Sequence, residues 1–423
     1  YRFFEPATKW QIQEISGKRF AITICEDIWE EQPCPATQKK MYKDFPLEKL
    51  KAQSPDYIIN LSASPFSFTH PGERREVLAT ASKKYQCPVI YVNQQGGNTD
   101  LVFDGGSMVV NPKGNIVEQL PLFSEDIRII DLQNLDTENK ATPLPSHISM
   151  IHEALVSGIH DYFTKSGFSK AVLGLSGGID SAVTAVLACR ALGSENVTGI
   201  LMPSQYSSDH SISDAIALAK NLGMRYEIIA IKDIYNSFEA GLNPHFEGTK
   251  PGIAEENIQA RVRGTLLMSW SNKFGNILLN TSNKSEMAVG YGTLYGDMCG
   301  AISVLGDVYK TTVYELAQFI NANQEVIPVN SIVKPPSAEL RENQKDSDSL
   351  PEYDLLDSIL EKYIEQNKSK DEIISEGYDA TIVHRIIALV NNNEYKRYQA
   401  PPVIRVTSKA FGPGRRMPLV AKF

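Results

Sequence analysis

The stretch that decides the fold is Leu173-Gly-Leu-Ser-Gly-Gly-Ile-Asp-Ser181. Residues 171–175 are apolar and fit a buried strand, and residues 181–192 continue with helical periodicity until Gly193 ends the pattern. Gly177 and Gly178 can adopt positive φ and let backbone N–H groups approach an anion, to which the following helix presents its positive end. The stretch therefore predicts a phosphate-binding loop at the carboxyl end of a strand.

The acidic residue in this loop distinguishes it from a Walker loop. A Walker loop carries a Lys before its final Ser or Thr, whereas here Asp180 precedes Ser181. Because hard cations take carboxylate and phosphate oxygens, Asp180 is a candidate Mg²⁺ ligand. An ordinary Gly-Gly turn is the alternative, but the complete Ser-Gly-Gly-x-Asp-Ser string after a strand makes that alternative a minor one.

The hydrophobic pattern predicts two domains with an exposed connector between them. Short β-rich runs in the first region predict a layered α/β or β-rich domain, with strands at 19–24, 56–61, 88–92, 106–111 and 115–120. A polar segment with two prolines follows at 133–148. Beyond it, long helices alternate with strands expected at 171–175, 197–202, 226–231 and 277–279. This order predicts a doubly wound parallel sheet, so the expected domains are 1–132 and 149–423.

Composition is that of an enzyme rather than a nucleic-acid or membrane protein. The 423 residues are 42% hydrophobic and 22% charged, with a net charge of −8. A general nucleic-acid surface would need a basic stripe, and no apolar run approaches the roughly 20 residues of a membrane span. The five cysteines lack a Cys-x-x-Cys spacing, which argues against a disulfide framework or a zinc site. We therefore expect a cytoplasmic protein with reduced thiols.

The loop string resembles the pyrophosphate-binding motif of the AMP-forming ATP pyrophosphatases. Within that group, the segments at 256–261, 280–286, 291–297 and 394–397 look like those of glutamine-dependent NAD synthetases. The resemblance covers nearly the whole chain. It implies an N-terminally incomplete nitrilase-like α/β sandwich, which supplies ammonia from glutamine. A Rossmann-like (adenine nucleotide alpha hydrolase) ATP pyrophosphatase domain with a doubly wound parallel sheet would follow.

Cys25 is the informative residue of the first region. It ends an apolar run and begins a turn, as nucleophiles do on elbows in hydrolases, although a free Cys is commonly a small buried hydrophobic residue. The Cys-Glu-Asp-Ile-Trp29 string resembles the nucleophile segment of nitrilase-type amidases, which favours the nucleophile. The resemblance also implies that Ser64 holds glutamine and, more weakly, that Arg74 binds its carboxylate; either could equally be a surface-loop residue.

The resemblance assigns a second set of residues in the synthetase domain. Those expected to bind ATP are Gly174, Leu175, Ser176, Gly177, Gly178, Ile179, Asp180, Ser181 and Thr281. Those expected to bind deamido-NAD are Asn257, Arg261, Glu286, Tyr291, Gly292, Thr293, Leu294, Asp297 and Lys396. Asp180 and Glu286 are the expected Mg²⁺ ligands, and Lys310 is expected to stabilise phosphate charge. On the sequence alone, Thr281 and Glu286 could instead be a helix cap and a first-turn acid.

The implied reaction is the ATP-dependent amidation of deamido-NAD to NAD through a nicotinoyl adenylate, with AMP and pyrophosphate released. The ammonia would come from glutamine or from solution, and family members are homo-oligomers. Two other readings stay open: another AMP-forming amidotransferase with a different acceptor, and a non-catalytic nucleotide-binding scaffold.

One departure from the family pattern concerns the glutaminase. The family triad also uses a Glu base and a Lys upstream of the nucleophile, in segments this sequence does not contain. The Arg2-Phe-Phe-Glu-Pro stretch looks like the tail of the segment that follows the Lys. The chain is therefore expected to begin partway through the nitrilase-like domain, which leaves Cys25 without its base and its oxyanion-stabilising cation.

We predict that the 423-residue chain, assayed by itself, forms NAD far faster with ammonium than with glutamine. The measurement is NAD formation from deamido-NAD and Mg-ATP in parallel reactions with each nitrogen source. Equal turnover with glutamine would contradict the inference that the glutaminase is incomplete.

Overall fold

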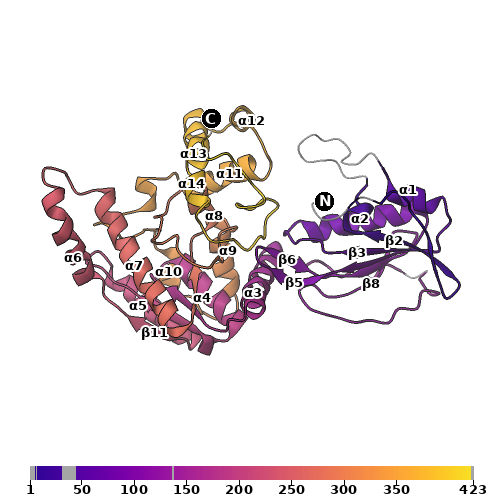
Figure 1. The fold of residues 1–423 in the computed structure, drawn as a ribbon, viewed down its shortest axis with the longest axis horizontal. Helices are drawn as coiled ribbons and strands as arrows, with labels where there is room; N and C mark the ends of the chain where they lie inside the picture. Colours follow the sequence, from indigo (N-terminus) through magenta and orange to yellow (C-terminus); the bar gives the residue numbers. More distant parts are fainter. Residues whose placement is uncertain (1–4, 6, 31–43, 136–137, 421–423) are drawn as a thin grey trace. The chain divides into compact units, whose positions relative to one another are not determined.

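The computed structural model describes residues 5, 7–30, 44–135 and 138–420. It divides the chain into two compact units (Figure 1), the first comprising Tyr1–Gly96 with Val102–His147, the second Gly97–Leu101 with Ile148–Phe423. Of the stretch at 2–6 only Glu5 is described, and Cys34 also lies outside the described residues. Among the described residues, no helix has both the length and the apolar character that crossing a bilayer requires.

The first unit is built on a mixed sheet with the strand order β1-β2-β3-β4-β7-β8. Strands β2, β3 and β4 are parallel, and the remaining pairs are antiparallel. The strands of this sheet are β1 (Gln13–Ile15), β2 (Lys18–Ile24), β3 (Tyr57–Ser62), β4 (Val89–Asn93), β7 (Met108–Val110) and β8 (Ile116–Gln119). The short pair β5 (Gln95–Asn98) and β6 (Leu101–Asp104) lies outside it.

Two helices cover the core of the first unit, α1 (Pro46–Lys51) and α2 (His70–Tyr85). Leu78 of α2 packs with Ala21, Ile58 and Val89 from three neighbouring strands, and all four are at most 1% exposed. Alternation along the strands sends these residues to one face. The predicted β-rich runs located β2, β3, β4, β7 and β8. The same pattern missed β1, β5 and β6, because these short strands carry little apolar alternation.

Residues 133–135 and 138–147 of the expected connector belong to the first unit. Leu135 is buried with Phe20 and Tyr57, and the Lys140 N–H donates to the Ile116 carbonyl at 2.7 Å. The structure thus groups this segment with the first unit and begins the second at Ile148. The domain limits at 132 and 149 stay a prediction, since an exposed polar composition does not reveal that a segment is hydrogen-bonded along its length.

The second unit contains an all-parallel sheet with the order β11-β10-β9-β12-β13. Its strands are β9 (Ala171–Gly174), β10 (Val197–Leu201), β11 (Arg225–Ile228), β12 (Ile277–Asn280) and β13 (Ile302–Ser303). Its α-helices are α3 (His147–Ser166), α4 (Ile179–Leu192), α5 (Asp209–Leu222), α6 (Lys232–Leu242), α7 (Ile253–Phe274), α8 (Lys284–Val289), α9 (Lys310–Ile320), α10 (Val329–Val333), α11 (Tyr353–Ile364), α12 (Lys370–Ser375), α13 (Ala380–Asn392) and α14 (Glu394–Arg397).

The strand order reverses beside β9. From β9 the chain builds outward to β10 and β11, then returns to place β12 on the other side of β9. Ligands bind at such a switch point, outside the carboxyl ends of the strands. The predicted doubly wound parallel sheet is confirmed. The two-residue strand β13 was missed because it is too short to show a periodicity.

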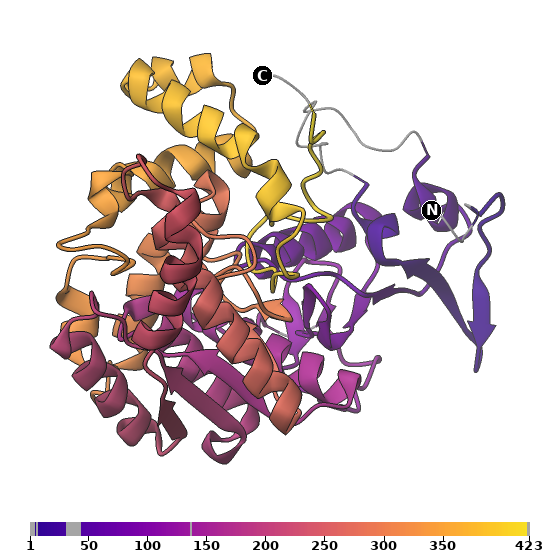
Figure 2. The same ribbon diagram turned by 60° about the vertical axis from the view of Figure 1, so that its left-hand side comes forward.

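A helical group near the carboxyl terminus packs behind α8. Figures 1 and 2 show α11, α12 and α13, in orange to yellow, gathered together. Leu356, Leu360, Val383 and Ile386 from this group are fully buried against Val289 of α8.

A buried ionic network ties α8 to this group and to the chain near residue 407. Lys284, 0% exposed, places its Nζ 2.9 Å from an oxygen of Asp307 and 2.9 Å from one of Glu365, and donates to Thr407 Oγ1 at 2.8 Å. Asp307 in turn accepts the Val406 and Thr407 N–H groups. Lys284 is shared by two carboxylates, and the backbone N–H groups further satisfy Asp307, so the network fixes the position of α8 and gives each of these three ions a partner.

We predict that Lys284→Met destabilises the chain by about 3–5 kcal/mol, because it leaves Asp307 and Glu365 buried without their shared cation. Lys220→Met removes an exposed Lys from the last turn of α5 and should change stability by less than about 0.5 kcal/mol. Urea unfolding of the two variants measures the difference. Equal midpoints would show that the network does not stabilise the fold.

Candidate functional site

The glycine loop, residues 176–181, follows β9 and includes the first residues of α4. Its hydroxyls bond back to the loop: Ser176 Oγ accepts from the Gly178 N–H at 3.1 Å, and Ser181 Oγ donates to the Gly178 carbonyl at 3.0 Å. Gly177 has φ +76°, and a Cβ there would lie 2.2 Å from the carbonyl oxygen of Ser211 on α5. Only glycine fits this position, because the backbone is both left-handed and in contact with a neighbouring helix.

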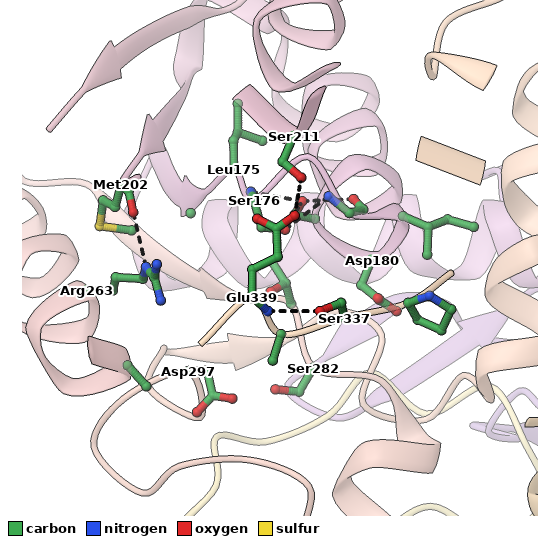
Figure 3. Close-up of a pocket in the computed structure, with 18 of the residues that line it drawn as sticks. Leu175, Ser176, Asp180, Met202, Ser211, Arg263, Ser282, Asp297, Ser337 and Glu339 are labelled. Carbon is green, nitrogen blue, oxygen red and sulfur yellow. Dashed lines mark hydrogen bonds between the residues drawn. The ribbon is translucent and has the colours of Figure 1, made fainter. Parts of the chain in front are cut away.

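A cavity of about 300 Å³ lies in front of the loop (Figure 3). Its walls come from the carboxyl ends of β9, β10 and β12, from α7, and from the segment at 334–340. The residues predicted for ATP, deamido-NAD or metal that line it are Gly174, Leu175, Ser176, Gly178, Ile179, Asp180, Ser181, Thr281, Glu286, Tyr291, Asp297 and Lys310. The sheet topology thus brings together side chains that lie up to 136 positions apart in the sequence, from Gly174 to Lys310.

Two carboxylates and one lysine meet at one wall of the cavity. Lys310 Nζ lies 2.5 Å from an oxygen of Asp180 and 3.8 Å from one of Glu286. Asn283 donates from Nδ2 to the other oxygen of Asp180 at 2.9 Å. It also caps α8, because its Oδ1 accepts the Glu286 N–H at 2.9 Å. The alternative that Thr281 is the cap is therefore wrong, while Glu286 does occupy the first turn of α8.

The charges in this cluster are mutually dependent. Burial and the nearby charge of Asp180 raise the pKa of Glu286, whereas Lys310 opposes the rise. Burial disfavours the charged form of Lys310, but the two carboxylates outweigh it and raise the pKa of Lys310. Lys310 is consequently a fixed cation, and the two acids depend on it for charge balance.

Asp357 of α11 holds the two helices that carry Glu286 and Lys310. Ser285 Oγ donates to Asp357 Oδ1 at 2.5 Å, and the N–H and Oγ1 of Thr311 both donate to Oδ2 at 2.9 Å. Ser285 and Thr311 directly adjoin Glu286 and Lys310 in the sequence. One buried carboxylate therefore sets the spacing of the helices that carry the acid and the lysine.

Several other predicted residues fix the loop at 290–297 rather than line the cavity. Lys396 donates to the carbonyls of Gly290 and Gly292 at 2.7 and 2.8 Å, and Thr293 Oγ1 donates to Asn257 Oδ1 at 2.7 Å. Arg261 is exposed and donates from Nε to the Leu294 carbonyl at 3.3 Å. Their assignment to deamido-NAD stays a prediction.

In the first unit, Cys25 stands at the turn between β2 and a short 3-10 helix, Cys25–Ile28. Its φ of +48° is unusual for a residue with a side chain and matches a displayed nucleophile. Burial, aided by the charge of Glu26, raises the pKa of the Cys25 thiol. The groups described around Cys25 therefore do not by themselves favour the thiolate.

The two residues predicted for glutamine are both buried. Ser64, 3% exposed, donates its backbone N–H to Asn93 Oδ1 at 3.0 Å. Arg74, 1% exposed, pairs through both terminal nitrogens with Asp104, at 3.0 and 2.7 Å. Neither is a surface-loop residue, so that alternative is wrong for both. Because Arg74 already has a carboxylate partner, its pairing favours a structural role over capture of a second carboxylate.

Two family models match the chain: NAD synthase over residues 151–400 and carbon-nitrogen hydrolase over residues 45–140. A glutamine-dependent NAD(+) synthetase from Synechocystis sp. is 48% identical over 426 residues, covering 100% of this chain and 76% of the relative. This chain belongs to the glutamine-dependent NAD(+) synthetase family. The family member from Acinetobacter baylyi is 44% identical over 99% of this chain and 76% of its own length.

A solved structure agrees with these relatives. The glutamine-dependent NAD+ synthetase of Acinetobacter baumannii, solved in complex with ADP, is 40% identical over 99% of this chain and 76% of its own. The TM-score is 0.74. The family's fold is therefore the fold of this chain, with a nitrilase-like unit followed by an NAD synthase unit.

Sequence reasoning missed several residues that line the cavity. The main ones are Arg263 of α7, Ser211 of α5, Lys334, Glu339 and Asp346. Asp346 accepts hydrogen bonds from the hydroxyls of Tyr291 and Tyr353 at 3.1 and 2.8 Å. Arg263 lies two positions beyond the predicted Arg261, and its helical offset turns it toward the cavity. The helical period of α7 is the signal that could have separated the two arginines.

We predict that Gly177→Ala destabilises the chain by about 2 kcal/mol or more, since the new Cβ meets both a left-handed backbone and the Ser211 carbonyl. Gly174→Ala is the matched variant, because its Cβ would make ordinary contacts with Met202 and Leu267 at 3.4 and 3.5 Å. Its expected cost is below about 1 kcal/mol. Chemical unfolding compares the two, and a Gly177 variant as stable as the Gly174 variant would refute the steric assignment.

Proposed function

We propose that this chain converts deamido-NAD to NAD with ATP, through a nicotinoyl adenylate, and releases AMP and pyrophosphate. The single observation that carries the proposal is the glycine loop with Asp180, Glu286 and Lys310 gathered beside it in one cavity. This arrangement offers backbone N–H groups, a helix N-terminus and a fixed cation to a triphosphate. The relatives described above, which are glutamine-dependent NAD(+) synthetases, support the choice of acceptor.

The residues at the cavity wall fit Mg²⁺. Asp180 and Glu286 supply carboxylate oxygens, and Mg²⁺ commonly binds through one or two carboxylates together with substrate phosphates. Among the described residues no cluster of three or more His, Cys, Asp or Glu side chains could hold a metal without substrate. When bound, Mg²⁺ would be held by Asp180 and Glu286 and would supply positive charge against the negative charge that develops on pyrophosphate.

In the first step, a carboxylate oxygen of the nicotinate group bonds to the α-phosphorus of ATP, and the α–β bridging P–O bond breaks. The loop N–H groups hold the departing pyrophosphate, and Lys310 stabilises its negative charge. Because the carboxylates raise the pKa of Lys310, this side chain stays charged throughout the working pH range. Asp357 keeps α9, and with it Lys310, at the correct distance from Glu286.

In the second step, ammonia attacks the carbonyl carbon of the adenylate. A C–N bond forms, the C–O bond to AMP breaks, and the surplus proton of the ammonium group is released. A carboxylate is a poor acyl donor and AMP is a good leaving group, which explains why ATP is cleaved between its α and β phosphates. The loop at 290–297, held by Lys396 and Asn257, is proposed to position deamido-NAD.

Cys25 is proposed as the nucleophile that supplies ammonia from glutamine. Its Sγ attacks the side-chain amide carbon, the C–N bond breaks, and ammonia leaves with the thiol proton. Water then cleaves the thioester to glutamate. Activation needs a base and a cation near the thiol, since burial raises the pKa of Cys25. The cytoplasmic location and the homo-oligomeric state predicted above remain part of this proposal.

The experiment that tests the proposal follows the products of the ammonium-dependent reaction. Deamido-NAD, Mg-ATP and ammonium should yield NAD, AMP and pyrophosphate in equal amounts. Asp180→Ala should abolish AMP formation while the fold is retained, because the variant loses a carboxylate facing the phosphates. Asp233→Ala, which removes an exposed first-turn acid from α6, should keep full activity.

Formation of ADP in place of AMP would overturn the proposed reaction. An Asp180→Ala variant as active as the unchanged chain would overturn the metal assignment alone. ATP binding without any AMP formation would favour the scaffold reading.

A further inference from the structure

Arg263 is a half-buried cation that the proposed mechanism does not use. It belongs to α7 and lines the cavity, where its Nε donates to the Met202 carbonyl at 3.1 Å. Within the described part of the chain, its terminal nitrogens make no ion pair and no further hydrogen bond. A guanidinium carries five N–H donors, so four of them are left for a ligand.

Desolvation disfavours the charged form of the Arg263 guanidinium when it has no ionic partner. Burial lowers the pKa of Arg263 to about 10, and the charges of Glu339 and Asp297 only partly offset that effect. A desolvated arginine is normally paired with a carboxylate in direct contact. Arg263 instead turns the unpaired side of its guanidinium toward the cavity, so its partner is expected to be a molecule that enters there.

Arg263 stands at the apolar end of the cavity. Met202 and Leu267 converge on Gly174, because a Cβ at Gly174 would lie 3.4 and 3.5 Å from their terminal carbons. Leu267 lies one helical turn beyond Arg263 on the same face of α7. Leu201 and Leu278 complete this apolar wall. Figure 3 shows Arg263 beside Met202, with Glu339 between it and Asp180.

The charges around Arg263 favour a neutral ligand group over a phosphate. A phosphate placed against Arg263 would also face Glu339 and Asp297, the two acids whose fields reach it. The phosphates have a better place at the glycine loop, beside Lys310. A flat, neutral, aromatic group satisfies both the apolar wall and the planar guanidinium, which stacks on π faces and donates to ring nitrogens.

We propose that Arg263 binds the purine base of ATP. The base would pack against Met202, Leu267 and Gly174, and the phosphates would extend to the glycine loop. The inference rests on the proposed function, because it takes ATP to be the nucleotide. It assigns Arg263 to recognition of the base. Arg261, on the exposed side of the same helix, does not take part in that recognition. Arg263 is therefore a binding residue whose loss weakens ATP rather than deamido-NAD.

The test uses the full chain and three probes that separate the parts of ATP. Adenosine carries the base without phosphate, AMP adds the α-phosphate, and pyrophosphate carries no base. Calorimetric titration measures each affinity directly, without turnover. Arg263→Met should lower the affinity for adenosine and for AMP by about tenfold to a hundredfold, the range expected for a lost stacking and hydrogen-bonding partner. The affinity for pyrophosphate should change by less than about twofold.

Two further variants sharpen the result. Arg263→Lys keeps the charge but loses the planar fork, and should recover less than half of the lost binding energy for adenosine. Lys273→Met, which removes an exposed cation from the last turn of α7, should bind all three probes as the unchanged chain does. Steady-state kinetics should agree, with a raised KM for ATP and a KM for deamido-NAD within about twofold.

Specific outcomes would overturn the inference. A lower affinity for pyrophosphate with an unchanged affinity for adenosine would place Arg263 at the phosphates. A raised KM for deamido-NAD alone would place it at the other substrate. If the unchanged chain binds ATP and forms AMP while Arg263→Met binds adenosine normally, only this inference fails. If the unchanged chain binds none of the probes, the proposed function fails with it. Should Arg263→Met not fold, Arg263→Gln and Arg263→Lys provide the same comparison.

Discussion

The position of β9 between β10 and β12 determines where the chemical groups of the second unit lie. Parallel pairing on both sides aligns the carboxyl ends of three strands, so the chain leaves all three at the same edge of the sheet. The glycine loop follows β9, Met202 follows β10, and Thr281 follows β12. Without this order, the loop would be an isolated turn, and neither the apolar wall nor the acids would face it.

A second constraint follows from bringing charged groups to that edge. Asp180, Glu286 and Lys310 are close enough that none can be changed without altering the charge of the others. Burying them is costly unless each remains paired. The structure meets that requirement with support from behind: Asp357 fixes α8 and α9, and the Lys284 network fixes α8 against the helices near the carboxyl terminus. Asp357 and Lys284 do not line the cavity, yet the geometry of the acids and the lysine depends on them.

The first unit presents a different situation. The turn after β2 holds Cys25 at positive φ in a displayed position, but the described groups around it raise the pKa of its thiol. The position of the Cys25 side chain at the turn and the ionisation of its thiol are thus separate properties. The backbone supplies the first through local strain, and the second requires a base and a cation that act on the thiol. Arg74 is a buried cation of this unit, and Asp104 neutralises it.

The sequence by itself determined the features that arise from neighbouring residues. The apolar run of β9, the two glycines of the loop and the period of α4 express local sterics and local hydrogen bonding, so strand, loop and helix could be predicted together with the parallel sheet. The family resemblance extended this to residues such as Glu286 and Lys310. What only the tertiary structure decided are the meetings between distant side chains: Lys310 with Asp180, Arg74 with Asp104, Asn283 rather than Thr281 as the cap of α8, and Arg263 rather than Arg261 inside the cavity. These depend on the strand order and on the rotation of each helix about its axis. Both are set by packing across the whole unit, and no short stretch of sequence contains that information.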